Sequence, residues 1–212
     1  MKTTLTFKTN WPFLVALMLT GILFSQQEND GVKYLENEVV INDSPQNVWK
    51  TLTAFGNVSN FNSTIDDSVV LNGTSGEAHL GAEREVQIPN GVNNIINKER
   101  IITYTEGVYY TYDVYESENF PTKKMQVTYG VRQDYKGRTI LFSKTYYEMN
   151  SSLVTNFFKR KLKRANLDSL IAYKHYIETG ESDTEIKTIR KWYEDEEEHE
   201  DNGLIVINNK AN

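Results

Sequence analysis

Residues 81–116 read GAEREVQIPNGVNNIINKERIITYTEGVYYTYDVYE, and this stretch decides the fold class. Apolar or aromatic side chains alternate with polar ones along it, and turn sequences at residues 89–91 (PNG) and 106–107 (EG) interrupt the alternation. A period of two is typical of half-buried strands, and short turns containing Gly or Asn connect strands into antiparallel hairpins. The stretch therefore predicts three consecutive antiparallel strands, at about 81–88, 95–105 and 108–116.

The same alternation continues on both sides of this stretch. Turn signals at residues 72–73, 119–121 and 136–137 separate further strand-like runs, and no helical pattern falls between residues 68 and 148. Strands that follow one another through short turns pair in chain order as an antiparallel sheet. The additional strands are predicted at about 68–72, 123–134 and 138–149, and a first strand at 32–41 comes before them.

A short helix is predicted directly after the first strand. Ser44 can cap this helix, Pro45 suits its first position, and apolar residues follow at helical spacing up to Leu52. Glycine and asparagine then break the pattern over residues 55–61, where a second small helix or a turn is expected.

A long final helix is predicted from Leu153 to about Glu178, capped by Ser151 or Ser152. Its inner face repeats at steps of three and four residues and consists of Phe158, Leu162, Ala165, Ser169, Tyr173 and Ile177. The opposite side carries much of the basic run Lys159–Arg164. Such a run is most often a solvated face, and peripheral contact with an anionic membrane is the alternative.

The first 25 residues have the pattern of an export signal. Lys2 and Lys8 precede an apolar run from Trp11 to Phe24, and Ser25 stands before a polar junction. A basic start and an apolar run of about 14 residues are typical of a secretory signal peptide, whereas a bilayer-crossing helix needs roughly 20 apolar residues. We therefore expect cleavage near Ser25 and a periplasmic or extracellular protein. The alternative is a retained N-terminal membrane anchor.

The 212 residues carry a net charge of -6 and provide enough chain for one globular domain with a sizeable core. We place this domain at residues 32–179. Seven of the eight residues from Glu194 to Asp201 are acidic, which predicts a solvated, polar C-terminal tail over residues 180–212. The closing segment Leu204–Ile207 is apolar enough to add to a sheet edge, as a secondary possibility.

Composition and spacing also exclude several classes of chemistry. The chain has no cysteine, which removes thiolate catalysis and cysteine-ligated metals. His79, His175 and His199 are too scattered for a metal site, and no nucleotide-binding or hydrolase motif occurs. The net acidity argues against a nucleic-acid partner. We therefore expect no metal and no cofactor.

The order of elements resembles the helix-grip fold of the START-related SRPBCC superfamily over about residues 34–178. The local sequence is similar to that of its polyketide cyclase/dehydrase and lipid-transport group at SPQNVW (44–49), FGN (55–57), GAEREV (81–86), KERI (98–101), YDV (112–114) and ANLDSL (165–170). The resemblance implies an α+β protein with a curved seven-stranded antiparallel sheet wrapped around a long C-terminal helix. It also implies two short helices after the first strand and a cavity between the sheet and the long helix.

The resemblance further implies which side chains line that cavity. The implied residues are Arg84, Val86 and Ile88 from one strand, Glu99 from the next, Tyr112 and Val114 from the strand after it, and Phe158, Leu162 and Asn166 from the long helix. Arg84 and Glu99 are expected to face each other across adjacent strands, because a buried charge without a partner is very costly.

Three functions remain open at this point. We favour binding of a hydrophobic small molecule or lipid without catalysis, since the implied lining is apolar and aromatic with few titratable groups. The alternative is a polyketide cyclase- or dehydratase-like enzyme in which Glu99 acts as a base together with Arg84 and Tyr112. That chemistry needs burial to raise the pKa of Glu99; otherwise the charged pair is structural. A third possibility is an interaction module whose cavity is packed shut.

Overall fold

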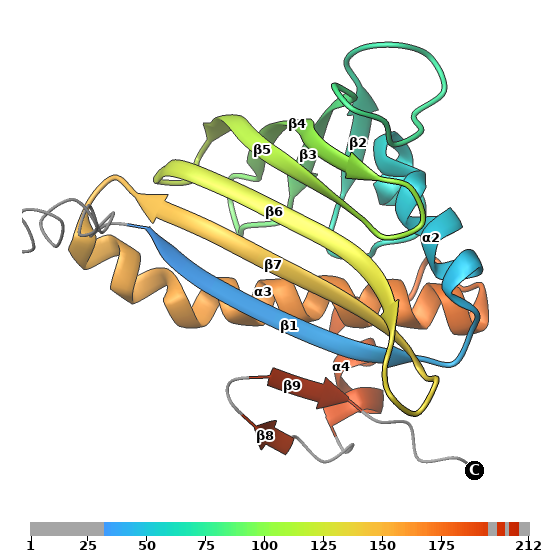
Figure 1. Cartoon of the computed structure of the whole chain (residues 1–212). Helices are drawn as coiled ribbons and strands as arrows, with labels where there is room; N and C mark the ends of the chain where they lie inside the picture. Colours follow the sequence, from blue (N-terminus) through green and yellow to red (C-terminus); the bar gives the residue numbers. More distant parts are fainter. Residues whose placement is uncertain (1–31, 195–198, 202–203, 208–212) are drawn as a thin grey trace, which may run out of the picture. The chain divides into compact units, whose positions relative to one another are not determined.

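A computed structural model of the chain describes residues 32–194, 199–201 and 204–207 (Figure 1). The elements follow in the order β1 (Lys33–Ile41), α2 (Pro45–Thr53), the 3-10 helix η1 (Phe55–Asn60), β2 (Asp67–Val70), β3 (Glu83–Ile88), β4 (Ile95–Thr105), β5 (Tyr109–Glu118), β6 (Thr122–Gln133), β7 (Thr139–Met149), α3 (Ser152–Thr179), α4 (Ile186–Glu194), β8 (His199–Asp201) and β9 (Leu204–Ile207). The seven predicted strands are confirmed, each end lying within two residues of its predicted position.

The seven predicted strands are neighbours in the order β2-β3-β4-β5-β6-β7-β1, and every pair among these seven is antiparallel. The short strands β9 and β8 extend the same sheet beyond β1. Strands β2 to β7 are neighbours in chain order, as expected for consecutive hairpins. The first strand then pairs with the last one of the meander, Lys33 opposite Tyr147. This is the predicted seven-stranded antiparallel sheet.

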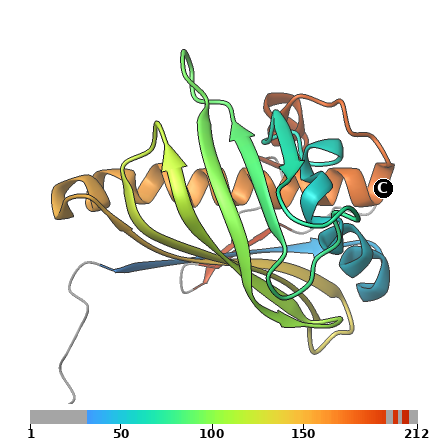
Figure 2. The same ribbon diagram turned by 90° about the horizontal axis from the view of Figure 1, so that it is seen from above.

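The sheet curves around the long helix α3, which runs along its concave side (Figure 2). Two register shifts between β4 and β5, next to Glu99 and Ile101, mark bulges in the ladder. A bulge increases the local twist of a sheet and helps it to bend. Because one helix cannot fill the whole concave face, this geometry leaves space between the sheet and α3.

The helix signals of the sequence are also confirmed. The Ser44 side chain caps α2 by accepting a hydrogen bond from the Asn47 amide at 3.2 Å, and Pro45 occupies the first helical position. Ser151 caps α3 through the Val154 amide at 3.3 Å. The helix α3 ends at Gly180, whose φ of 78° is the left-handed conformation that glycine adopts without strain.

The segment after Gly180 differs from the expected polar tail. Residues 186–194 form α4, which packs on α3 with Ile189 buried and Ile186 and Tyr193 partly buried. These apolar residues recur at steps of three and four, so the segment is an amphipathic helix despite its many charges. Further along, β9 pairs in parallel with β1, Glu38 opposite Val206. This is the addition to a sheet edge that the apolar segment Leu204–Ile207 suggested.

The predicted export signal and residues 195–198 of the acidic run lie outside the described residues. Within the described part of the chain, no helix is long and apolar enough to cross a membrane.

Candidate ligand-binding cavity

A cavity of about 360 Å³ lies between the concave face of the sheet and α3. Its walls come from the strands β3 to β7, from α3, from the segment between η1 and β2, and from α4. The lining residues are Val58, Asn62, Ser63, Thr64, Ile65, Arg84, Ile88, Pro89, Glu99, Tyr112, Met125, Val127, Tyr129, Thr145, Leu162, Ala165, Asn166, Asp168, Ser169, Tyr173, Ile186 and Arg190.

Six of the nine residues that the sequence suggested for this site line the cavity: Arg84, Ile88, Glu99, Tyr112, Leu162 and Asn166. Val86 and Val114 are buried in the core and do not form its wall. Phe158 is partly buried and packs edge-on against Phe120, with their ring centres 5.4 Å apart. Alternation along a strand identifies an inward residue, but it does not show whether another side chain covers that residue.

Arg84 and Glu99 form a buried ion pair in the cavity wall. They are register partners on β3 and β4, and both side chains are 4% exposed. The Arg84 Nε and Nη2 atoms lie 2.7 and 2.6 Å from Glu99 Oε2, and Nη1 donates to the Phe55 carbonyl oxygen at 2.6 Å. The guanidinium also lies over the Phe55 ring, 3.9 Å from its centre. The cation is therefore held by a carboxylate, a carbonyl and an aromatic face.

The second oxygen of Glu99 has a different environment. Both Arg84 nitrogens contact Oε2, and Oε1 accepts no hydrogen bond from any residue that the structure describes. Burial raises the pKa of the Glu99 carboxyl above its ordinary value, while the adjacent guanidinium acts in the opposite direction. Glu99 thus offers the cavity one hydrogen-bond acceptor whose charge Arg84 already balances.

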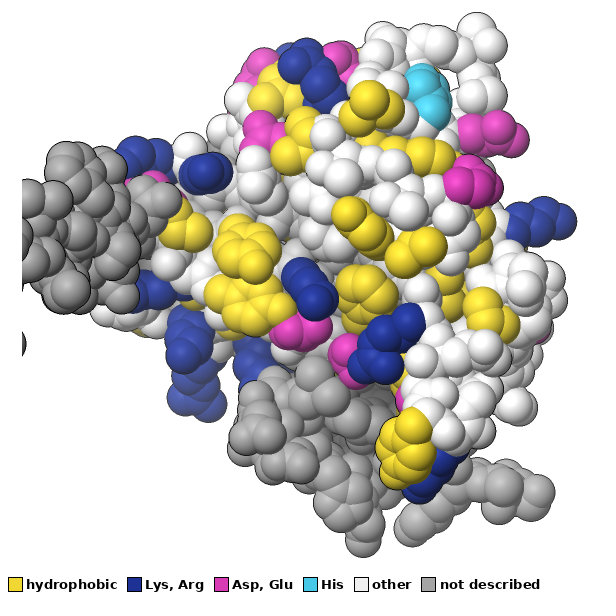
Figure 3. Space-filling model, in the orientation of Figure 1, with side chains coloured by type: hydrophobic (Ala, Val, Ile, Leu, Met, Phe, Trp, Pro, Cys, Tyr) yellow, Lys and Arg dark blue, Asp and Glu magenta, His cyan; other side chains and the backbone are white. Residues whose placement is uncertain are grey.

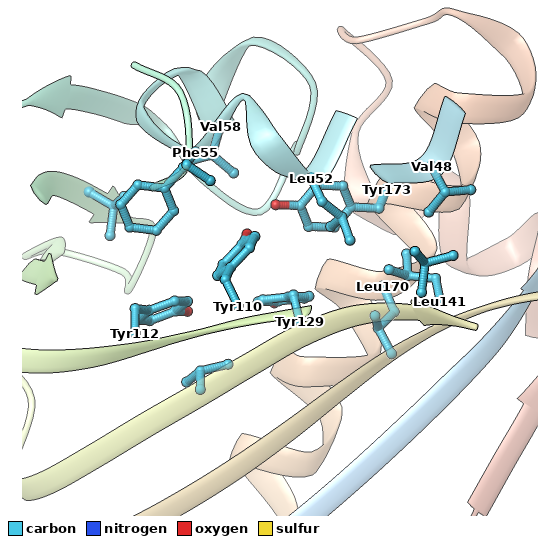
Figure 4. Packing of buried hydrophobic residues seen from close by; sticks show 14 of the residues in the cluster. Val48, Leu52, Phe55, Val58, Tyr110, Tyr112, Tyr129, Leu141, Leu170 and Tyr173 are labelled. Carbon is cyan, nitrogen blue, oxygen red and sulfur yellow. The ribbon is translucent and has the colours of Figure 1, made fainter. Parts of the chain in front are cut away.

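Tyrosine rings form the wall that faces α3 (Figure 4). The rings of Tyr112 and Tyr129 are stacked with centres 6.4 Å apart, and Tyr129 lies 5.5 Å from Tyr173 on α3. The Tyr129 hydroxyl is 2.8 Å from Ser169 Oγ, whereas no described residue hydrogen-bonds the Tyr112 hydroxyl. Burial raises the pKa of all three phenols, so they stay protonated at neutral pH and can donate a hydrogen bond.

Amides and hydroxyls add polar groups near α3. Asn166 accepts a hydrogen bond from Ser143 and donates one to Thr145, both at 2.8 Å. Asn62 donates to Ser169 Oγ at 3.0 Å. These groups hold α3 against β7 and the segment after η1, so they act mainly as structural contacts and leave few open donors for a ligand.

The helix α4 contributes an edge of the cavity that sequence reasoning missed. Arg190 donates to both carboxylate oxygens of Asp168 on α3, at 2.7 and 2.5 Å, and Ile186 lines the cavity beside it. The amphipathic spacing of residues 186, 189 and 193 was the available signal, but the surrounding charges concealed it. Among the described residues, no group of three or more histidine or acidic side chains is placed to hold a metal ion.

The fold and the cavity together define a helix-grip protein of the SRPBCC superfamily, as the sequence predicted. A model of the family described as polyketide cyclase / dehydrase and lipid transport matches residues 34–173. The chain belongs to this family. The match ends within α3, so α4 and the strands after it lie beyond the matched region.

Solved structures show the same fold at low sequence identity. Major latex-like protein 151 from Panax ginseng is 21% identical, with a TM-score of 0.56 over 71% of this chain and 97% of that one. A protein from Nitrosospira multiformis is 15% identical, with a TM-score of 0.53 over 70% of this chain and 98% of that one. A search of curated protein sequences gave no match.

Proposed function

We propose that the protein binds an amphipathic hydrophobic molecule in the cavity between the sheet and α3, without transforming it. The observation that carries this proposal is the cavity itself, with a mixed apolar and aromatic wall around one neutralised ion pair. Small-molecule sites are typically concave, about 300 to 1,000 Å³ in volume, and mostly apolar with a few placed polar groups. SRPBCC proteins commonly bind hydrophobic ligands, and family membership supports the same role here.

The polar groups of the cavity favour a ligand that carries a hydroxyl rather than a carboxylate. Arg84 already contacts Glu99 and the Phe55 carbonyl, so its charge is balanced within the wall. A carboxylate placed beside Glu99 would be repelled and would lack a counter-ion. A hydroxyl, in contrast, can donate to Glu99 Oε1 and accept from the Tyr112 hydroxyl. A hydrogen bond to a charged group contributes about 1.5 to 3 kcal/mol.

The first experiment is native mass spectrometry of the protein isolated from its own cells, followed by denaturing extraction and identification of any retained molecule. We expect a stoichiometric apolar molecule with at least one alcohol or phenol group. The second step compares matched pairs, a long-chain alcohol with the corresponding fatty acid and a sterol with its methyl ether. A clean unliganded mass that persists after challenge with all four compounds would rule out the binding role.

Preferential binding of the acid over the alcohol would contradict the predicted polarity alone. Glu99→Gln and Tyr112→Phe should each weaken the alcohol about tenfold, because each removes one of the two proposed hydrogen bonds. Exposed Tyr135, in the turn between β6 and β7, provides the matched control as Tyr135→Phe.

A second candidate function is a cyclase- or dehydratase-like reaction. It is favoured by one observation, a buried carboxyl with a raised pKa and one open oxygen in the cavity that Tyr112 also lines. In such a reaction Glu99 would remove a proton next to a carbonyl, and the Tyr112 hydroxyl would donate to the oxygen that gains charge. Turnover of a retained polyketide-like molecule that Glu99→Gln abolishes, without loss of binding, would establish this activity. Unchanged turnover in that variant would exclude it.

We also propose that the chain is exported, on the basis of residues 1–25 alone. Fractionation of the source cells and the intact mass of the protein test this proposal. A mass that begins near residue 26 in an extracytoplasmic fraction is expected. A full-length protein in the membrane fraction would favour the retained anchor.

A further inference from the structure

The outer face of α3 changes character halfway along the helix. In its first half, Leu153 is 83% exposed and Phe157 is 68% exposed, although both are large apolar side chains. In the second half, Asp168 and Ile171 continue this face at helical spacing but are buried, and Arg190 of α4 hydrogen-bonds to Asp168. Among the described residues, this face of α3 is therefore covered in the second half of the helix and exposed in the first half.

The uncovered half is also strongly basic. Residues 153–167 contain five Lys or Arg and no Asp or Glu. Arg160 continues the face of Leu153 and Phe157 at a step of three residues, and Lys161 lies with its Nζ atom 5.5 Å from the centre of the Phe157 ring. Lys and Arg side chains gather over this part of the molecule in Figure 3. We call the surface formed by Leu153, Phe157, Arg160 and Lys161 the α3 patch.

We propose that the α3 patch docks on an anionic lipid bilayer. A helix that combines exposed Leu and Phe with flanking Lys and Arg lies in the bilayer interface, with its apolar side chains below the headgroups and its cations among them. The positive charge of the patch is complementary to anionic lipid headgroups, and each Lys or Arg near an anionic surface contributes to the attraction. Long basic side chains can also extend their charges to the headgroups while their stems stay apolar.

Other parts of this chain fit the patch less well. The acidic run Glu194–Asp201 matches its charge but contains no apolar side chain that could cover Leu153 and Phe157. The apolar segment Leu204–Ile207 forms β9 on the edge strand β1. An anionic bilayer supplies negative charge for the cations of the patch and an apolar layer for its Leu153 and Phe157 side chains.

The direction in which the chain enters the domain is consistent with this assignment. The first strand begins opposite the end of β7, where Lys33 pairs with Tyr147, and α3 starts directly after β7. The start of β1 and the α3 patch therefore lie at the same end of the sheet, and an N-terminal anchor, if retained, joins the domain at that end.

The α3 patch also adjoins the ligand cavity. The neighbouring ring of Phe158 touches both Phe157 and Phe120, with ring centres 5.6 and 5.4 Å apart, and one turn further along α3 Leu162 lines the cavity. Docking through Phe157 would therefore place a wall of the cavity at the bilayer surface. An apolar ligand could then pass between bilayer and cavity without crossing water.

Sedimentation with vesicles tests the proposal on the full domain. Vesicles of phosphatidylcholine with one-third phosphatidylglycerol are compared with vesicles of phosphatidylcholine alone. We expect binding to the anionic vesicles that weakens as salt is added. Arg160→Glu with Lys161→Glu should lower the partition coefficient more than tenfold, because each removed cation costs roughly fivefold and the reversed charges add repulsion. Leu153→Ser with Phe157→Ser should lower it about tenfold while keeping the response to lipid charge.

A direct readout of insertion is the fluorescence of Phe157→Trp. Its added emission should shift to the blue on anionic vesicles and be quenched by brominated acyl chains. The matched controls, Tyr135→Ser and Lys136→Glu, change an exposed aromatic residue and its neighbouring cation in the turn between β6 and β7 and should bind like the parent protein. Circular dichroism confirms that each variant is folded.

Three results would overturn the proposal. The first is absence of binding to anionic vesicles, and the second is binding that the patch variants leave unchanged. The third is a dimer in light scattering that Phe157→Ser dissociates, which would assign the patch to a second copy of the chain. Ligand affinity, measured without vesicles on the same variants, separates this surface from the proposed function: it should stay unchanged.

Discussion

Arg84 and Glu99 are direct register partners on β3 and β4, and their side chains form a buried ion pair with an Nη2–Oε2 distance of 2.6 Å. Pairing across adjacent strands means that the sheet register itself brings the two charges together. The same pair lies in the cavity wall, so the stability of the sheet and the polarity of the site depend on one contact.

Removing one member of this pair should be much more destabilising than removing both. Arg84→Met or Glu99→Leu leaves a buried charge without its counter-ion, and we expect a loss of about 3 to 5 kcal/mol in the free energy of unfolding. The double variant should recover most of that loss, because no buried charge remains. Urea unfolding of the three variants measures this. Additive losses in the double variant would mean that the pair does not act as a unit.

The exposed pair of Lys98 and Glu116 on β4 and β5 is the control for that experiment. It joins neighbouring strands in a similar way but lies in water, where an ion pair contributes little. Lys98→Met should leave the urea midpoint nearly unchanged.

The buried tyrosines predict a loss of stability at alkaline pH. Burial raises the pKa of Tyr110, Tyr112, Tyr129 and Tyr173 above the ordinary value, so the folded protein keeps these protons after the unfolded chain has lost them. The unfolded state is thus favoured as the pH rises above about 10, and stability below that pH is unaffected by these groups. An absorbance titration of tyrosinate should show late-titrating groups that appear together with unfolding. Tyr129→Phe should remove one of them, and a titration complete before unfolding would contradict the prediction.

The contact between Asp168 and Arg190 predicts that α4 can be released without unfolding the sheet. The two side chains join α3 to α4 by two hydrogen bonds at the edge of the cavity. Arg190→Ala should cost about 1 to 3 kcal/mol of local stability. Hydrogen exchange should then become faster in α4 than in β5 to β7, and a bound ligand should dissociate faster. Equal acceleration in all elements would show that α4 is part of one cooperative unit.

A side chain at position 130 should clash with its neighbours in the sheet. On β6 Gly130 lies opposite Phe142 of β7, and an added Cβ atom would come 2.7 Å from the Val108 carbonyl oxygen and closer still to the Phe142 ring. Gly130→Ala should therefore lower the free energy of unfolding by about 1 to 3 kcal/mol. Adding Phe142→Leu should recover part of the loss, which thermal unfolding can measure. A neutral Gly130→Ala variant would mean that the two strands separate easily at this point.

Much of the architecture could be predicted because local signals repeat in the sequence. The alternation around Tyr112, the turn at Gly107 and the caps at Ser44 and Ser151 each act over a few residues, and each appears in the structure where it was expected. Part of the site could also be predicted from the sequence. The resemblance to the SRPBCC superfamily implied that Arg84 and Glu99 point inward from adjacent strands, and the cost of an unpaired buried charge then favoured their contact.

The rest depended on contacts between residues that are distant along the chain. Ser169 was predicted for the inner face of the last helix, but its contacts with Tyr129 and Asn62 required the packing of α3 on the sheet. Arg190 reaches Asp168 only because α4 folds back on α3, and no local pattern records that return.

The sequence by itself determined the seven strands, their chain-order pairing and the long helix, since each follows from a short-range period, and its resemblance to a known family implied the inward charged pair. Only the tertiary structure decided the volume of the cavity, its Tyr112 and Tyr129 wall, and the half of α3 that α4 leaves uncovered. Those features depend on how far a curved sheet stands from the helix that it surrounds. That distance is set by the sum of many side-chain contacts, and no single stretch of sequence contains it.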